Sequence, residues 1–137
     1  MPTRVVNRYK EKGTVSIARR RVGFHFGNPF FLGNSAIGVV AVETRREAVI
    51  GYYEWLRGTN PFYAIIEPDR RQWILDNLEG LRGEVLECTC DPSACHGHVL
   101  QVLLGEITLE DVLAKLAAEE NKFIPPKADS AQIDLFA

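Results

Sequence analysis

The sequence predicts an α/β fold: a small single-domain, Rossmann-like sheet of mainly parallel strands flanked by helices. Short apolar segments typical of strands alternate with segments of helical periodicity, and this order favours parallel pairing. The 137 residues, 46% of them hydrophobic, suffice for one buried core. The chain contains no internal repeat. We therefore expect one domain over residues 1–120 and a flexible tail over residues 121–137.

The first two strands are expected at residues 4–6 and 14–18, with Gly13 between them. Residues 19–30 follow, with three consecutive arginines, glycines and several aromatic side chains. Pro29 argues against a regular element there, because proline lacks a backbone donor. This segment is therefore predicted to be a loop at the end of a strand.

Two helices are expected in the middle of the chain. Thr44 and Glu47 have the spacing of a capping box, which begins a helix that runs to about Arg57. Gly58 is typical of the residue that ends such a helix. A second helix is expected at about residues 69–78.

The last strand is expected at residues 84–90. Asp91 is typical of an N-cap and Pro92 of a first helical residue, so a third helix is expected to begin there. Thr108 and Asp111 have the spacing of a cap for a final amphipathic helix. This order of strands and helices favours a small α/β sheet with parallel pairing.

Composition and charge limit the partners and the compartment that the sequence predicts. The 16 basic and 18 acidic residues leave a net charge of −2, so any contact with nucleic acid must be local. We find no segment typical of a signal peptide or a membrane span, which predicts a cytoplasmic protein without a membrane partner. In that compartment thiols stay reduced, so the three cysteines are predicted to be ligands, nucleophiles or core residues before disulfides.

Residues 88–98 hold all three cysteines and two of the three histidines. The predicted helix start puts Cys95 and His96 in its first turn, where unpaired N–H groups favour a thiolate or a bound anion. Three interpretations stay open. The thiols are buried core residues, or Cys95 is a nucleophile with His96 moving protons, or the segment binds zinc. The metal ligands would be Cys88, Cys90, Cys95 and His96. His98 is expected on the solvent face of the helix.

Both chemically rich segments follow predicted strands, and ligands gather at the carboxyl ends of parallel strands. We therefore expect residues 19–30 and the Cys/His segment to face one crevice. Arg21 would hold a phosphate, Gly27 and His25 would contact the substrate, and Asn28 would orient it. The alternative is that the arginines form a solvated edge and that the glycine and proline only turn the chain.

Three motifs resemble those of the family called domain of unknown function 4326, common in bacteria and their phages. They are Val5-Val-Asn7, Gly27-Asn-Pro-Phe30 and Cys88-x-Cys90-x-Pro92-x-x-Cys95-His96. The resemblance covers roughly residues 4–105. It implies a compact α/β domain with a link to nucleotide or nucleic-acid chemistry, without an established reaction. This chain has His98 where the family usually has an acidic residue.

The tail carries a second signal. Residues 132–136 resemble the pentapeptide by which bacterial polymerases and repair proteins bind the β sliding clamp. Leu135 and Phe136 offer adjacent apolar anchors, Gln132 can donate and accept hydrogen bonds, and Asp134 can orient the backbone. The alternative is that the tail docks on its own domain.

Two functional hypotheses result. In the first, a DNA replication or repair protein docks on the clamp and carries an α/β domain that acts on a nucleotide or nucleic acid. In the second, a non-enzymatic clamp binder, of phage or bacterial origin, inhibits or redirects host replication. The substrate and the reaction are not determined by the sequence.

Overall fold

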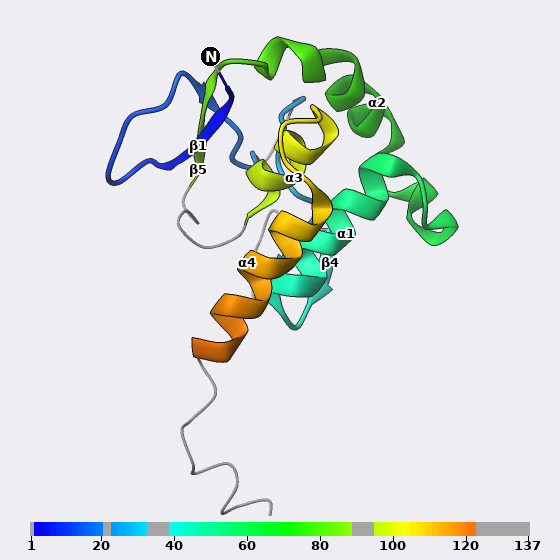
Figure 1. Ribbon diagram of the computed structural model, residues 1–137. Helices are drawn as coiled ribbons and strands as arrows, with labels where there is room; N and C mark the ends of the chain where they lie inside the picture. Colours follow the sequence, from blue (N-terminus) through cyan, green and yellow to red (C-terminus); the bar gives the residue numbers. More distant parts are fainter. Residues whose placement is uncertain (1, 21–22, 33–38, 89–94, 123–137) are drawn as a thin grey trace, which may run out of the picture.

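The computed structural model describes residues 2–20, 23–32, 39–88 and 95–122. In this part of the chain four strands precede the first helix and a fifth strand lies between helices, so the predicted alternation of strands and helices holds only around that last strand (Figure 1). The strands are β1 (Arg4–Asn7), β2 (Val15–Ser16), β3 (Phe30–Leu32), β4 (Val40–Val42) and β5 (Val85–Cys88). The helices are α1 (Arg45–Arg57), α2 (Pro68–Asn77), α3 (His96–Leu103) and α4 (Leu109–Lys122), with short 3-10 helices η1 (Pro61–Ile65) and η2 (Leu78–Leu81).

The strands pair in parallel, which confirms the predicted α/β class. In the larger sheet β5 is central, between β1 and β2, and its register places Asn7 of β1 opposite Cys88. Among the described residues, β3 and β4 form a separate parallel pair. These two strands were not predicted, because three-residue segments are too short to show an alternating pattern.

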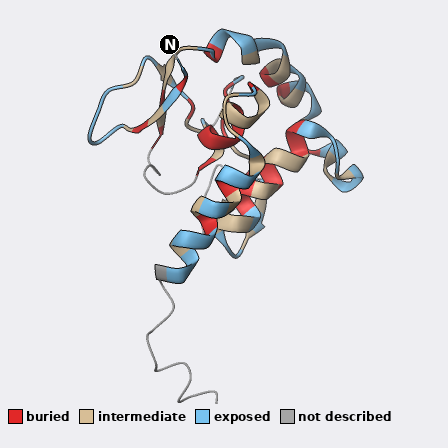
Figure 2. Ribbon diagram, viewed as in Figure 1, coloured by how far each residue is buried: buried red, intermediate tan, exposed pale blue. Residues whose placement is uncertain are grey.

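Helix α1 begins and ends as the sequence predicts. The Thr44 hydroxyl accepts the Glu47 N–H, and the Glu47 carboxylate accepts the Thr44 N–H at 3.0 Å. Gly58 closes the helix in the left-handed conformation, with φ 72°. Figure 2 shows buried residues concentrated where α1 and α3 meet the strands. The largest fully buried side chains include Tyr52 and Trp55 of α1.

Helix α4 runs beside α1 (Figure 1). Its predicted cap is present, since Thr108 and Asp111 exchange hydrogen bonds between backbone N–H groups and side chains. Val112 and Leu116 are each 1% exposed and belong to the core. No helix in the described part of the chain combines the length and the hydrophobicity that a membrane crossing requires.

Candidate functional site

Helix α3 starts later than predicted. Asp91 and Pro92 lie outside the described residues, and the N-cap is Cys95, so His96 is the first helical residue. Cys95 has an extended backbone (φ −146°, ψ 176°), and its sulfur accepts the Gly97 N–H at 3.3 Å. The prediction that Cys95 lies within the first helical turn is therefore wrong, because the thiol itself caps the helix.

His98 is the second half of this cap. Its Nδ1 accepts the Cys95 backbone N–H at 3.0 Å, and the side chain is only 9% exposed. The expectation of a solvent-facing His98 is wrong, because a capping box needs an acceptor at the third helical position and here a histidine supplies it. The His98 side chain therefore points inward and has a structural role.

The structure brings the thiols of Cys88 and Cys95 together. Their sulfur atoms are 3.3 Å apart, and each residue is 2% exposed. Cys88 shares the buried face of β5 with Leu86, as predicted from strand alternation. The third predicted sulfur ligand, Cys90, lies outside the described residues.

The described residues test the zinc interpretation only in part. They contain no group of three or more histidine, cysteine or acidic side chains placed to share a metal ion. Cys88 and Cys95 supply two adjacent sulfur donors of the kind that zinc prefers. His96 directs its Nε2 at the Ile17 carbonyl instead. The zinc site remains a prediction.

His96 is oriented from two sides. Its Nε2 lies 2.6 Å from the Ile17 carbonyl oxygen, which can only accept, so Nε2 carries the proton. The ring also packs edge-on against Tyr52, with centroids 5.2 Å apart. Burial raises the pKa of Tyr52 far above its ordinary value, and its hydroxyl donates to the Phe26 carbonyl. In the neutral His96 ring, Nδ1 is then the nitrogen that accepts a proton.

A pocket of about 170 Å³ joins the two segments that the sequence predicts to converge. Asn28 comes from the loop before β3, Arg45 from the start of α1, and Cys95 and His96 from the start of α3. The apolar part of the lining comprises Phe30, Leu32, Ala48 and Val49. The pocket lies near the carboxyl ends of β5 and β2, since β5 ends at Cys88 and Ile17 follows β2 directly. Arg21, the predicted phosphate ligand, lies outside the described residues.

Asn28 also has a structural task. Its Nδ2 donates to the Ala48 carbonyl and its Oδ1 accepts the Phe30 N–H, both at 2.9 Å. These bonds fasten the loop to α1 and to the start of β3. An asparagine side chain offers two donor hydrogens and two acceptor lone pairs, so one of each is left for a ligand.

His25 and Gly27 do not line this pocket. The His25 Nδ1 accepts the Gly27 N–H at 3.1 Å, and both backbone carbonyls accept hydrogen bonds from Arg70, at 2.8 and 2.7 Å. Burial, with help from the nearby charges of Arg70 and Arg19, lowers the pKa of His25 to about 4. His25 is therefore neutral near pH 7 and holds the loop in shape.

The buried side chain of Arg70 anchors the loop that contains His25 and Gly27. Arg70 is 4% exposed, pairs with Glu67 at 2.6 Å and lies over the Trp55 ring. Arg19, from the predicted phosphate-binding run, pairs with the same carboxylate at 2.8 Å. Sequence reasoning missed Arg70, because a cation inside a polar helix gives no sign of burial.

Arg45 was also missed, although a signal for it exists. Cations are disfavoured in the first turn of a helix, because the N-terminal end carries the positive end of the helix dipole. The sequence nevertheless has Arg45 and Arg46 directly after the cap residue. They face Glu119 and Glu120 of α4, at 3.6 and 2.8 Å. Two arginines at the positive end of the helix dipole therefore indicate a tertiary or functional role for these side chains.

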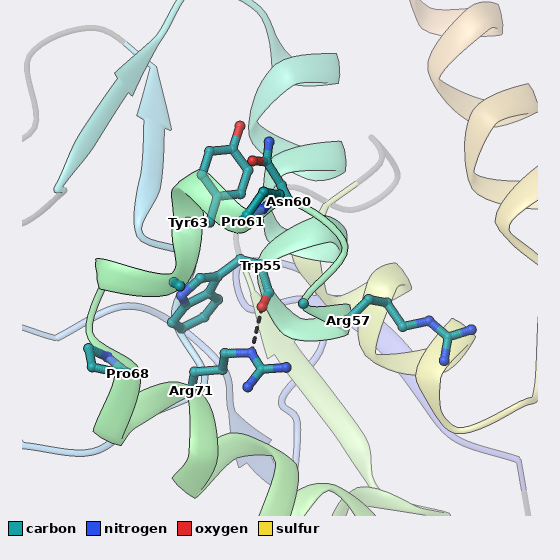
Figure 3. A pocket seen from close by; sticks show the side chains of 9 residues that line it. Trp55, Arg57, Asn60, Pro61, Tyr63, Pro68 and Arg71 are labelled. Carbon is teal, nitrogen blue, oxygen red and sulfur yellow. Dashed lines mark hydrogen bonds between the residues drawn. The ribbon is translucent and has the colours of Figure 1, made fainter.

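A second pocket, of about 370 Å³, lies between the end of α1, η1 and α2 (Figure 3). Arg71 donates to the Trp55 carbonyl at 2.6 Å, the bond drawn in Figure 3, and to the Leu56 carbonyl at 2.8 Å. Since these are carbonyls of the last turn of α1, Arg71 serves as a cap for the helix end. The pocket without a thiol or histidine is therefore the less suitable candidate for chemistry.

The fold and the site define a small parallel α/β domain with a Cys/His centre where strands end and a helix begins. The family model of the domain of unknown function 4326 matches residues 4–106, and the chain belongs to this family. This confirms the resemblance found in the three motifs. Searches of curated proteins and of solved structures found no match.

Proposed function

We propose that this protein serves DNA replication or repair, docks on the bacterial β sliding clamp through residues 132–136, and binds a nucleotide or nucleic-acid group in the Cys95 pocket. The observation that carries the proposal for the domain is the convergence of Asn28, Arg45, Cys95 and His96 on one small pocket. Ligand sites of parallel α/β sheets occupy this position.

The chemistry of the pocket suits a small anionic group. Arg45 brings a cation, and Asn28 retains hydrogen-bonding capacity. A volume of about 170 Å³ suits one phosphate or one ring, so a larger ligand would extend out of the pocket. Cys95 would act as the nucleophile, with its charge stabilised by the Gly97 N–H, and His96 would move protons.

The tail has the length to act as a tether. Helix α4 ends at Lys122, and residues 123–131 separate it from the clamp motif. An extended chain covers roughly 3.3 Å per residue, so this spacer can hold a docked motif up to about 30 Å from α4. For docking through a short peptide motif, micromolar affinity is expected.

Clamp docking is tested with purified clamp and the full chain. Replacement of both Leu135 and Phe136 by alanine removes the apolar anchors and is expected to weaken binding at least about tenfold. Lys127→Ala, outside the motif, is the matched control and should leave the affinity unchanged. The dissociation constants come from biolayer interferometry. Equal affinities for the double variant and the parent would refute docking through this motif.

Ligand binding is tested by isothermal titration with nucleoside phosphates and short single-stranded oligonucleotides. Arg45→Met should weaken binding about tenfold and reduce its dependence on salt, because one cationic contact is lost. Arg46→Met is the matched control, since Arg46 lines the groove between α1 and α4 instead. If no member of the panel binds, or if both substitutions act alike, the pocket is not the ligand site.

The second candidate, a non-enzymatic clamp binder, is favoured by a specific observation. Cys88 and Cys95 are buried, and His96 and Asn28 make internal hydrogen bonds, so each of these residues also has a structural role. A Cys95→Ala variant separates the two candidates. Full inhibition of clamp-dependent DNA synthesis by this folded variant favours the binder, whereas loss of a ligand-dependent reaction favours the enzyme.

A further inference from the structure

The contact between Cys88 and Cys95 goes beyond what core packing requires. Their sulfur atoms are 3.3 Å apart, within the distance of a sulfur hydrogen bond. A disulfide has a bond of about 2.05 Å, so the sulfurs would need to approach by only about 1.3 Å. The two residues are separated by seven positions in sequence, and each comes from a different kind of element.

Both thiols are held by rigid surroundings. Cys88 ends the central strand, and its carbonyl accepts the Arg8 N–H at 2.8 Å. Cys95 is held by the bond from its own N–H to His98. Helix α3 packs tightly on the strands, because a Cβ at Gly97 would come within 2.8 Å of the Ile17 side chain. The thiol pair is therefore preorganised by the fold.

The two sulfurs differ in access and in environment. Among the described residues, Cys95 lines the 170 Å³ pocket and Cys88 does not. The Cys95 sulfur also accepts the Gly97 N–H at the start of α3, a position that favours negative charge on sulfur. A small oxidant that enters the pocket would thus meet Cys95 first, with Cys88 directly behind it.

We propose that Cys95 and Cys88 are a redox-active pair that reduces a peroxide in the pocket and closes to an intramolecular disulfide. The Cys95 thiolate attacks one peroxide oxygen, the O–O bond breaks, and with one proton the leaving oxygen departs as water or alcohol. Cys95 is then a sulfenic acid. The Cys88 sulfur attacks the Cys95 sulfur, the S–S bond forms, and the sulfenic oxygen leaves as water. The two thiols lose two electrons, and the peroxide gains them.

This activity needs neither the clamp nor a nucleotide, so it stands or falls separately from the proposed function. The test uses the full chain, reduced and treated with a chelator, and hydrogen peroxide as the probe. Intact mass should fall by about 2 Da, with two thiols lost to alkylation, and dithiothreitol should restore both. Cleavage before Asp91 followed by fragmentation should locate the bond between Cys88 and Cys95.

Three single variants separate the roles of the cysteines. Cys90→Ala should still close to the disulfide. Cys88→Ala should stop at a sulfenic acid, seen as a mass gain of about 16 Da that dimedone traps. Cys95→Ala should lose the Cys88 thiol, measured by alkylation and peptide mapping, at least about tenfold more slowly, because Cys88 is buried and does not line the pocket. Far-UV circular dichroism shows whether each variant is folded.

Several outcomes overturn the proposal. A disulfide that involves Cys90 in the unmutated chain would assign the chemistry to another pair. Thiols that resist peroxide in the folded, chelator-treated chain would mean that the contact is packing only. Equal rates of Cys88 oxidation in Cys95→Ala and in the parent would remove Cys95 from the attacking position. The mapping on the unmutated chain keeps the test decisive even if a variant fails to fold.

Discussion

A buried arginine organises the loop that leads to the site. Arg70 donates to the carbonyls of His25 and Gly27 and pairs with Glu67. Glu67 itself has a positive φ of 35°, an uncommon conformation for a residue other than glycine. Since its carboxylate binds both Arg70 and Arg19, these contacts compensate for the local backbone cost.

Acid should destabilise the protein through His25. The pKa of His25 falls from 6.5 to about 4 in the folded state, because of burial and because Arg70 and Arg19 are close. Between these values the unfolded chain binds more protons, so the free energy of unfolding decreases as the pH falls from about 6.5 to about 4. We expect a loss of the order of 1–2 kcal/mol after allowance for solvent screening.

The measurement is urea unfolding at several pH values between 7 and 4. His25→Asn is the control, because its side-chain oxygen can accept the Gly27 N–H and does not titrate. The parent should lose more stability than this variant over the interval. Parallel curves would show that His25 does not titrate with a lowered pKa.

At the scale of elements, the start of α3 connects the sheet to the pocket. A cysteine and a histidine replace the usual oxygen-bearing residues of a capping box. This choice ties the helix cap to the thiol pair, so a change in the chemistry of Cys95 also changes the bond to the Gly97 N–H. The Cys95 sulfur atom therefore serves both the helix cap and the candidate chemistry.

The loop before β3 depends on one close backbone approach. A Cβ on Gly27 would lie 2.3 Å from the Arg19 Cα, so Gly27→Ala must push two backbone segments apart. We expect a loss of about 3 kcal/mol or more in the free energy of unfolding. Gly80→Ala is the control, because a Cβ there meets nothing within 4 Å, and it should change stability by less than about 0.5 kcal/mol. Denaturation midpoints compare the two, and a mild effect at Gly27 would contradict the tight crossing.

At the scale of the whole molecule, α4 extends the domain beyond the family match. The match ends at residue 106, whereas α4 begins at Leu109 and buries Val112 and Leu116 in the same core. Arg45 and Arg46 of α1 also pair with acidic residues of α4. Helix α4 therefore belongs to the folding unit of this chain.

Two truncations test this boundary. A chain of residues 1–106 loses the burial of two large apolar side chains, each of which contributes about 1.5–3 kcal/mol. Its free energy of unfolding should fall by about 3–6 kcal/mol. A chain of residues 1–122 should unfold like the full chain, since it keeps α4. Thermal and urea unfolding measure both, and an unchanged stability of the shorter chain would exclude α4 from the core.

Much of the candidate site is predictable from residue type and order. Parallel strands bring their following loops to one edge, and this rule predicts that Asn28 lies close to Cys95 and His96, as they do in the pocket. The rule works on segments and not on individual side chains. It did not separate Asn28, which lines the pocket, from His25 and Gly27, which pack beneath the same loop.

The sequence by itself determined the α/β class, the caps of α1 and α4, and the family, because each of these depends on residues a few positions apart or on a motif. The cap of α3 is also local, but the sequence did not reveal it, because a cysteine and a histidine are not the usual residues of a capping box. Only the tertiary structure decided the place of Arg45 and the contact between Cys88 and Cys95. These features depend on which surfaces pack together. Packing between distant segments has no local pattern from which a sequence reader can infer it.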